Sequence, residues 1–212
     1  MPLKSVQTFP MHHMNRAPAV SAVLLGFAGV VGVAGQQPAR WATGASILVW
    51  IDQANAPAGS AALVDRALAV WSAALDRSVT LQRVSAPADA AVRVRFSRSP
   101  GLYGETRPTL DSRTGAIVHA DVVIATDTGG DEPMTQRIVL YLTALHELGH
   151  ALGLRHTDNF SDIMYSFRRP DDGERYFAAY RQRLRSPDDI GSTAATGLSP
   201  NDLAAARELY RR

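Results

Sequence analysis

Two kinds of hydrophobic pattern divide the chain into expected strands and helices. Short apolar, β-prone runs predict strands at residues 46–52, 79–84, 91–97 and 116–125, with a short edge strand within the loop 100–108. Apolar residues at helical spacing predict helices at residues 60–76, 134–152 and 199–212, with a further helix around 174–184. The length of 212 residues suits one domain with its own core.

Side-chain direction and helix ends follow from the same pattern. In residues 91–97 the alternation directs the apolar side chains inward and the two arginines outward. Ser60 is the expected N-cap of the first helix. Ser199 is the expected N-cap of the last helix, with Pro200 at its first position. Trp71 follows the helical period, so we expect it in the core without a functional role.

The helix expected at residues 134–152 has two different faces. Its apolar residues fall within about 80° of one another, at Ile138, Tyr141, Leu145, Leu148 and Leu152. His146 and His150 lie on the other side, about 40° apart around the axis, and can bind one metal ion. Histidines that only packed in the core would lie within the apolar stripe, so this pattern favours a metal site.

The stretch from His146 to His156 reads HELGHALGLRH and fits the pattern H-E-x-x-H-x-x-G-x-x-H. Glu147 lies about 100° from His146, where it suits a general base acting on metal-bound water. Gly153 is expected to end the helix in the left-handed conformation, which can bring His156 back as a third ligand. Three protein ligands with one open position are typical of a catalytic zinc site, so one zinc ion is the expected cofactor.

Composition excludes several other kinds of protein. The chain has no cysteine, which excludes a disulfide framework, a thiol nucleophile and cysteine-ligated zinc. Its formal net charge of +2 is too small to indicate a nucleic-acid partner.

The first 35 residues have the features of a targeting segment. Lys4 and Arg16 precede an apolar run at 17–34, and small residues stand near its end. We predict a signal peptide at residues 1–35 and a catalytic domain at 36–212. The alternative is an uncleaved membrane anchor. Export without disulfides favours a secreted or cell-envelope protein, periplasmic or extracellular, of bacterial origin.

The motif and the residues after it resemble the metzincin metallopeptidases, and within that clan the matrixins. Met164 stands where the Met-turn methionine is expected, Tyr165 follows it as in matrixins, and the segment LSPNDLAAARELY is similar to the matrixin C-terminal helix. The resemblance implies an α/β (α+β) fold of the zincin type. Its twisted, mostly parallel sheet of about five strands would pack on two long helices. Subdomains at 41–153 and 154–212 are expected, the second ending in a helix.

The resemblance also implies a function, that of a monomeric zinc endopeptidase acting on extended protein or peptide substrates, with Glu147 as general base. Met164 would lie beneath the metal without binding it. The substrate would pair with the edge strand by strand addition, contacting Gly104, Glu105 and Thr106. Tyr165 has two interpretations, a transition-state hydrogen-bond donor or, as we favour, packing in the wall of the site.

The accessory ion sites of matrixins are reduced in this chain. The loop that carries structural zinc and calcium in that family is shortened, and His119 with Asp121 resembles a remnant of it. A lone strand histidine is more often packed than metal-bound, which argues against a second zinc. Asp127, Asp131 and Glu132 could bind Ca²⁺, although a solvated loop is favoured.

Two other functions stay open from the sequence. One is a zinc-dependent nuclease of the three-histidine type, which Glu147, the export signal and the near-neutral charge disfavour. The other is a non-catalytic zinc-containing module that only binds peptides. Such a module has no need of Glu147, and the chain retains it.

Overall fold

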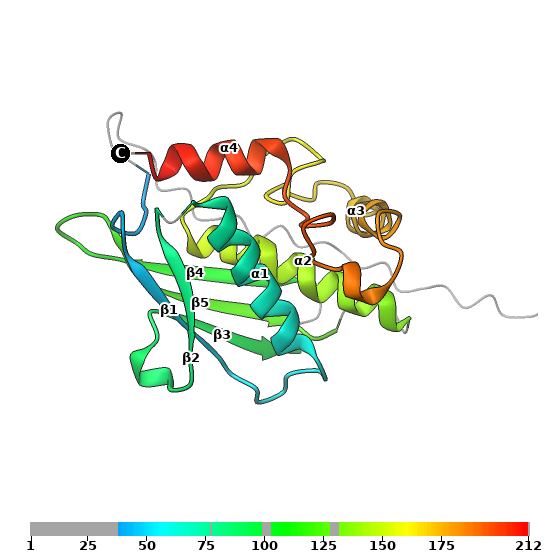
Figure 1. Cartoon of the computed structure of the whole chain (residues 1–212), viewed down its shortest axis with the longest axis horizontal. Helices are drawn as coiled ribbons and strands as arrows, with labels where there is room; N and C mark the ends of the chain where they lie inside the picture. Colours follow the sequence, from blue (N-terminus) through cyan, green and yellow to red (C-terminus); the bar gives the residue numbers. More distant parts are fainter. Residues whose placement is uncertain (1–37, 77, 99–102, 128–131, 212) are drawn as a thin grey trace, which may run out of the picture.

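The computed structural model describes residues 38–76, 78–98, 103–127 and 132–211. The expected signal peptide and Asp131 lie outside the described residues. Within the described part, two long helices pack against each other and against one face of a sheet (Figure 1).

The sheet has five strands in the order β2-β1-β3-β5-β4. Their bounds are Ser46–Ile51 (β1), Thr80–Val84 (β2), Val92–Ser97 (β3), Gly104–Leu110 (β4) and Ile117–Ala125 (β5). All neighbouring pairs are parallel except β4 with β5, which is antiparallel. The expected mostly parallel sheet is therefore confirmed, and β4 forms one of its edges.

Four α-helices accompany the sheet within the described residues. Their bounds are Ser60–Ala74 (α1), Pro133–Ala151 (α2), Asp172–Arg181 (α3) and Pro200–Leu209 (α4). Two short 3₁₀ helices lie at Pro87–Asp89 (η1) and Pro187–Asp189 (η2). As expected, Ser199 caps α4, and Pro200 occupies its first turn.

Most element ends differ from the expected ones by one to three residues, and the cap of α1, the extent of β4 and the start of α3 differ as follows. The N-cap of α1 is Gly59, at φ +79°, and the hydroxyl of Ser60 instead donates to the carbonyl of Pro57 at 2.6 Å. Strand β4 is seven residues long because its pairing with β5 continues through Pro108 to Leu110. Helix α3 begins at Asp172, two residues before the expected start.

The core lies between the sheet and the helices. The three apolar residues of β3 are buried and its arginines are more exposed, as the alternation indicates. Trp71 of α1 is fully buried, and its indole Nε1 donates to the carbonyl of Leu145 on α2 at 2.8 Å. The apolar stripe of α2 is buried along its length. This stripe holds the helix in place, so its opposite side is presented in a defined orientation.

Residues distant in sequence hold the end of α2. A helix leaves its last carbonyls without partners inside the helix. Trp41 Nε1 donates to the carbonyl of Ala151 at 2.7 Å. The hydroxyl of Tyr210 donates to the carbonyl of Leu152 at 2.7 Å. No helix among the described residues combines the length and hydropathy that crossing a membrane requires.

Candidate active site

Three imidazole rings converge at the end of α2. His146 and His150 lie on its last turns, and His156 follows the helix. His156 Nε2 lies 3.2 Å from His146 Nε2 and 3.1 Å from His150 Nε2. Two nitrogens bound at zinc distances in a tetrahedral arrangement stand about 3.3 Å apart. Both distances are close to this spacing, and ligand atoms of all three residues lie within 4.8 Å of one another, which is compatible with one zinc ion. No other cluster of three metal-ligating side chains occurs among the described residues.

Backbone carbonyls hold two of the rings from behind. His146 Nδ1 lies 2.6 Å from the carbonyl oxygen of Ile163, and His150 Nδ1 lies 2.9 Å from that of Leu154. A carbonyl only accepts, so each Nδ1 carries the proton and donates it. Each Nε2 is then the unprotonated nitrogen, which is the form that binds a metal ion. Such carbonyl partners commonly fix the tautomer and orientation of metal-binding histidines.

The turn after α2 brings the third histidine back. Gly153, at φ +101°, donates its N–H to the carbonyl of His150 at 2.9 Å, and Leu154 donates to that of Gly149 at 3.0 Å. These two bonds form a Schellman motif, which needs a left-handed residue at this position. A Cβ on Gly153 would also lie 2.2 Å from the carbonyl oxygen of Ala39. Glycine is therefore required here both for the turn and for the close approach.

Burial keeps the histidines neutral in the metal-free site. Desolvation, followed by the neighbouring His150, lowers the pKa of His146 to about 3. Desolvation likewise lowers the pKa of His150 to about 4, and the pKa of His156 is lowered for the same reason. A metal ligand must be the neutral imidazole, so the cluster is in its binding form at neutral pH.

Glu147 is 5% exposed and lies between α2 and the edge strand. Burial raises the pKa of its carboxyl group to about 7, while the hydrogen bond from Thr106 opposes this rise. The hydroxyl of Thr106 lies 2.7 Å from Glu147 Oε2. A carboxyl group with a pKa near neutrality can both accept and donate a proton in this pH range.

Gly104 lets the edge strand approach this carboxylate closely. A Cβ on Gly104 would lie 2.7 Å from Glu147 Cγ, 2.8 Å from Oε1 and 2.9 Å from Thr143 Cγ2. Real Cβ atoms essentially never come within 3.0 Å of another heavy atom in this way. The edge strand is therefore seated directly over Glu147.

Met164 packs beneath the helix at Gly149. A Cβ on Gly149 would lie 2.5 Å from Met164 Sδ and 3.2 Å from a ring carbon of Trp71. Gly149 occupies one of the unspecified positions of the motif, between Glu147 and His150. Its lack of a side chain is what allows the methionine to reach the helix at this level.

A buried network from α4 holds the turn that contains Met164. Asp202 accepts from the N–H groups of Ile163 at 2.8 Å and Ser199 at 2.8 Å. Ser199 Oγ donates to Asp162 at 2.8 Å. The carbonyl of Ile163 accepts from His146, so one residue, Ile163, links Asp202 to the candidate ligand. The capping box of α4 is thus connected through Ile163 to the three-histidine cluster.

The remaining candidate residues have other partners. The hydroxyl of Tyr165 donates to Asp172 Oδ2 at 2.9 Å, which favours packing over a role as a transition-state donor. Glu105 pairs with Arg107 at 2.8 Å. His119 Nε2 lies 3.5 Å from Asp121.

Glu132, one of the residues considered for calcium, serves as the N-cap of α2. Its side chain accepts from the N–H groups of Met134 and Thr135. Of the other residues considered for calcium, Asp127 is exposed and Asp131 is not described.

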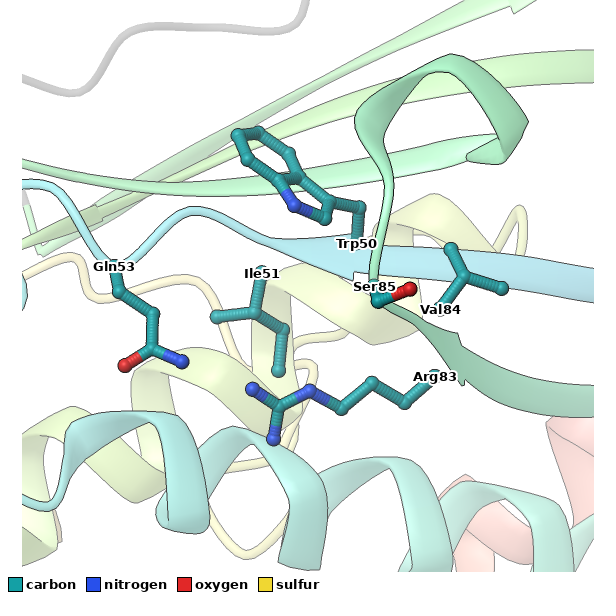
Figure 2. A pocket seen from close by; sticks show the side chains of 6 residues that line it. All are labelled: Trp50, Ile51, Gln53, Arg83, Val84 and Ser85. Atoms are coloured by element: carbon teal, nitrogen blue, oxygen red, sulfur yellow. The ribbon is translucent and has the colours of Figure 1, made fainter.

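A separate cavity of about 690 Å³ lies at the opposite edge of the sheet (Figure 2). Its lining residues come from the end of β1 and from β2 with the residue after it, together with Gln53. The guanidinium of Arg83 there pairs with Asp65 of α1. None of the histidines or Glu147 lines this cavity, so we assign it no part in the chemistry.

The fold and the three-histidine cluster together are those of the metzincin class. Residues 52–180 match the family model of the matrixins (Peptidase M10), and the chain belongs to the matrixin family. The resemblance inferred from the motif is thereby confirmed.

Individual relatives are similar over shorter stretches. The chain is 33% identical to human matrix metalloproteinase-15 over 129 residues, or 53% of this chain and 19% of that protein. It is 31% identical to mouse matrix metalloproteinase-25 over 132 residues, or 56% of this chain and 20% of that protein. A 63-residue stretch is 43% identical to rat macrophage metalloelastase, which is 26% of this chain and 14% of that protein. The matched region thus spans at most about a fifth of each relative.

Several residues around the site had no assigned role in the motif. Gly149 and the carbonyls of Ile163 and Leu154 carry no sequence signal for the contacts they make. Asp202 does have one, since Ser199 followed three residues later by an acidic residue indicates a capping box. That pattern predicts the helix start, although it says nothing of the contact with Ile163.

Proposed function

We propose that this protein is a zinc endopeptidase, secreted or located in the cell envelope, that cleaves extended segments of proteins. The observation that carries the proposal is the convergence of three Nε2 atoms whose rings are held from behind, beside a buried carboxylate on the same helix. His146, His150 and His156 would hold the ion. Membership of the matrixin family supports both the metal and the class of reaction.

The residues of the chain divide the chemistry between them. A bound zinc ion would lower the pKa of a water molecule and polarise the carbonyl of the substrate. Glu147 accepts the proton of that water through a carboxylate that Thr106 orients, and then donates it to the nitrogen of the leaving amine. Gly104 holds the strand close above Glu147, which excludes bulk water from this side of the carboxylate.

The edge strand supplies the means of holding a substrate. Among the described strands, β4 pairs only with β5, so we expect its other edge to accept an added strand. In this proposal the substrate backbone pairs with Gly104, Glu105 and Thr106, which align its scissile bond with Glu147. Met164 is the apolar floor beneath the metal. The partner is a protein or peptide, the enzyme is monomeric, and no nucleic acid takes part.

One experiment separates this proposal from the alternatives. Purified protein is supplied with one equivalent of zinc and incubated with an unfolded protein and, separately, with RNA, with and without a chelator. We expect cleavage of the protein that the chelator abolishes, and one zinc per chain by metal analysis. Chelator-sensitive cleavage of RNA alone would instead support the nuclease alternative.

Matched variants test the individual roles. Glu147→Ala should keep its zinc and lose activity by about 10²–10⁴-fold, the usual range for general acid–base catalysis. Undiminished cleavage by this variant would remove Glu147 from the mechanism. His156→Ala should bind zinc more weakly, and unchanged zinc affinity would exclude it as a ligand.

A further inference from the structure

Three aromatic rings fill the space beside the start of β4, next to the candidate catalytic carboxylate. Tyr103, which directly precedes Gly104, meets Phe177 of α3 edge-on at a centroid distance of 5.1 Å. It meets Phe167 in the same way at 5.8 Å, and these two phenylalanines meet each other at 6.0 Å. This cluster joins the edge strand to the segment that follows Met164.

Gly173 of α3 shows how closely the two sides approach. A Cβ on Gly173 would lie 2.7 Å from the hydroxyl oxygen of Tyr103 and 3.3 Å from two of its ring carbons. Its φ is outside the left-handed range, so glycine is needed here for the close approach rather than for a turn. No room is left for another side chain between Tyr103 and α3.

Exposure distinguishes the members of the cluster. Tyr103 is 37% exposed, whereas Phe177 is 8% exposed. Phe177 is thus fixed in the core beneath α3, and Tyr103 is the member that borders solvent. A bound peptide that lies along β4 would meet Tyr103 first.

The orientation of such a peptide follows from the strand, given the proposed function. Antiparallel pairing is the more stable arrangement, so the peptide runs opposite to β4. Its residues after the cleaved bond then lie towards the beginning of β4. Gly104 and Thr106 both lie against the carboxylate of Glu147. Tyr103 directly precedes Gly104, so it lies on the side of the carboxylate where the residue after the cleaved bond is expected.

We propose that Tyr103 is a specificity-determining residue that restricts the position after the cleaved bond to small residues, namely glycine, alanine or serine. This inference rests on the proposed peptidase function. A large side chain at that position would have to displace Tyr103 from Phe167, Phe177 and Gly173. A small one would fit beside the ring without moving it.

The test is a set of peptides that differ only in the residue after the cleaved bond, with products identified by mass spectrometry. For the wild-type enzyme, kcat/KM should be at least about tenfold higher with alanine than with leucine or phenylalanine, as expected when a site excludes larger groups. Tyr103→Ala should reduce this ratio by about tenfold. Tyr103→Phe is the matched control, because it keeps the ring and should keep the preference.

A second variant approaches the same contact from α3. Gly173→Ala should push the hydroxyl of Tyr103 aside and weaken the preference. Combining it with Tyr103→Phe, which removes the nearest atom, should restore part of the preference. This double variant distinguishes displacement of Tyr103 from general damage to α3.

The possible failures differ in what they overturn. A wild-type enzyme that prefers leucine or phenylalanine overturns this inference and leaves the peptidase function intact. The same holds if folded Tyr103→Ala keeps the wild-type preference. A zinc-loaded wild-type protein that cleaves no peptide overturns the proposed function, and this inference with it.

Discussion

The hydroxyl of Thr106 lies 2.7 Å from Oε2 of Glu147 and 2.9 Å from the backbone carbonyl oxygen of the same residue. One hydroxyl proton serves one acceptor at a time, and the ionised carboxylate is the stronger acceptor. The two residues are separated by 41 positions in the chain. This contact therefore couples the edge strand, where a substrate would bind, to the carboxylate that would move the proton.

Replacing Thr106 by valine should move the acidic limb of the pH–rate profile to higher pH. The hydrogen bond favours the ionised form of Glu147 and lowers its pKa, so its loss raises the pKa further. A charge-assisted bond of this kind corresponds to about one pH unit. The measurement is kcat/KM from pH 5 to 9, with Thr106→Ser as the control that keeps the hydroxyl. An unchanged acidic limb in Thr106→Val would contradict the coupling.

Adding a methyl group at Gly149 should destabilise the protein through Met164. Overpacking of this kind costs about 1–3 kcal/mol in the free energy of unfolding. In Gly149→Ala/Met164→Ala the colliding sulfur is gone, so the double variant should be less destabilised than the sum of the single variants. Urea unfolding of the four proteins measures this coupling. Strict additivity would show that the two side chains do not compete for one space.

Removing the carboxylate of Asp202 should affect the metal centre as well as stability. Asp202→Ala leaves buried N–H groups without an acceptor. It also removes a hydrogen bond that holds Ile163, whose carbonyl accepts from His146. We expect zinc affinity to fall by about 10–100-fold, as for other partners of metal ligands. The control is Ser199→Ala, which should cost about 1 kcal/mol as a lost helix cap and leave zinc affinity nearly unchanged. Equal zinc affinity in both variants would contradict the link through Ile163.

Acid should destabilise the metal-free protein, with Glu147 acting against this effect. His146 and His150 have pKa values lowered by burial, so their contribution to stability is present above pH 6.5 and is lost as the pH falls below it. The raised pKa of Glu147 acts oppositely, because its contribution is present below about pH 4.5 and is lost as the pH rises through about 7.

The window between pH 4.5 and 6.5 separates these two contributions. There the unfolded chain binds up to two more protons at His146 and His150, with a contribution of the same sign from His156, and the folded chain binds one more at Glu147. Stability therefore rises with pH, with a net slope of at least about 1.4 kcal/mol per pH unit. In Glu147→Gln the opposing contribution is absent, and the slope should be steeper by about 1.4 kcal/mol per pH unit. Urea unfolding in chelator at pH 5 and 6 tests this, and equal slopes would contradict it.

The sequence alone was sufficient to predict most helices and strands and the position of the three-histidine cluster. The spacing of His146, His150 and His156 is local, because one helix and one glycine turn bring all three together. The apolar stripe of α2 and the alternation in β3 depend on the same short-range periods. Local geometry also accounts for Ser199 and Pro200, which begin α4 as expected.

Only the tertiary structure decided which residues surround that cluster. Gly104 and Thr106 reach Glu147 because β4 pairs with β5 at the edge of the sheet and α2 packs beneath it. Asp202 of α4 reaches Ile163, and Gly173 of α3 lies against Tyr103, which is distant from it in the chain. Such contacts depend on how whole elements pack, and no residue period within one segment encodes them.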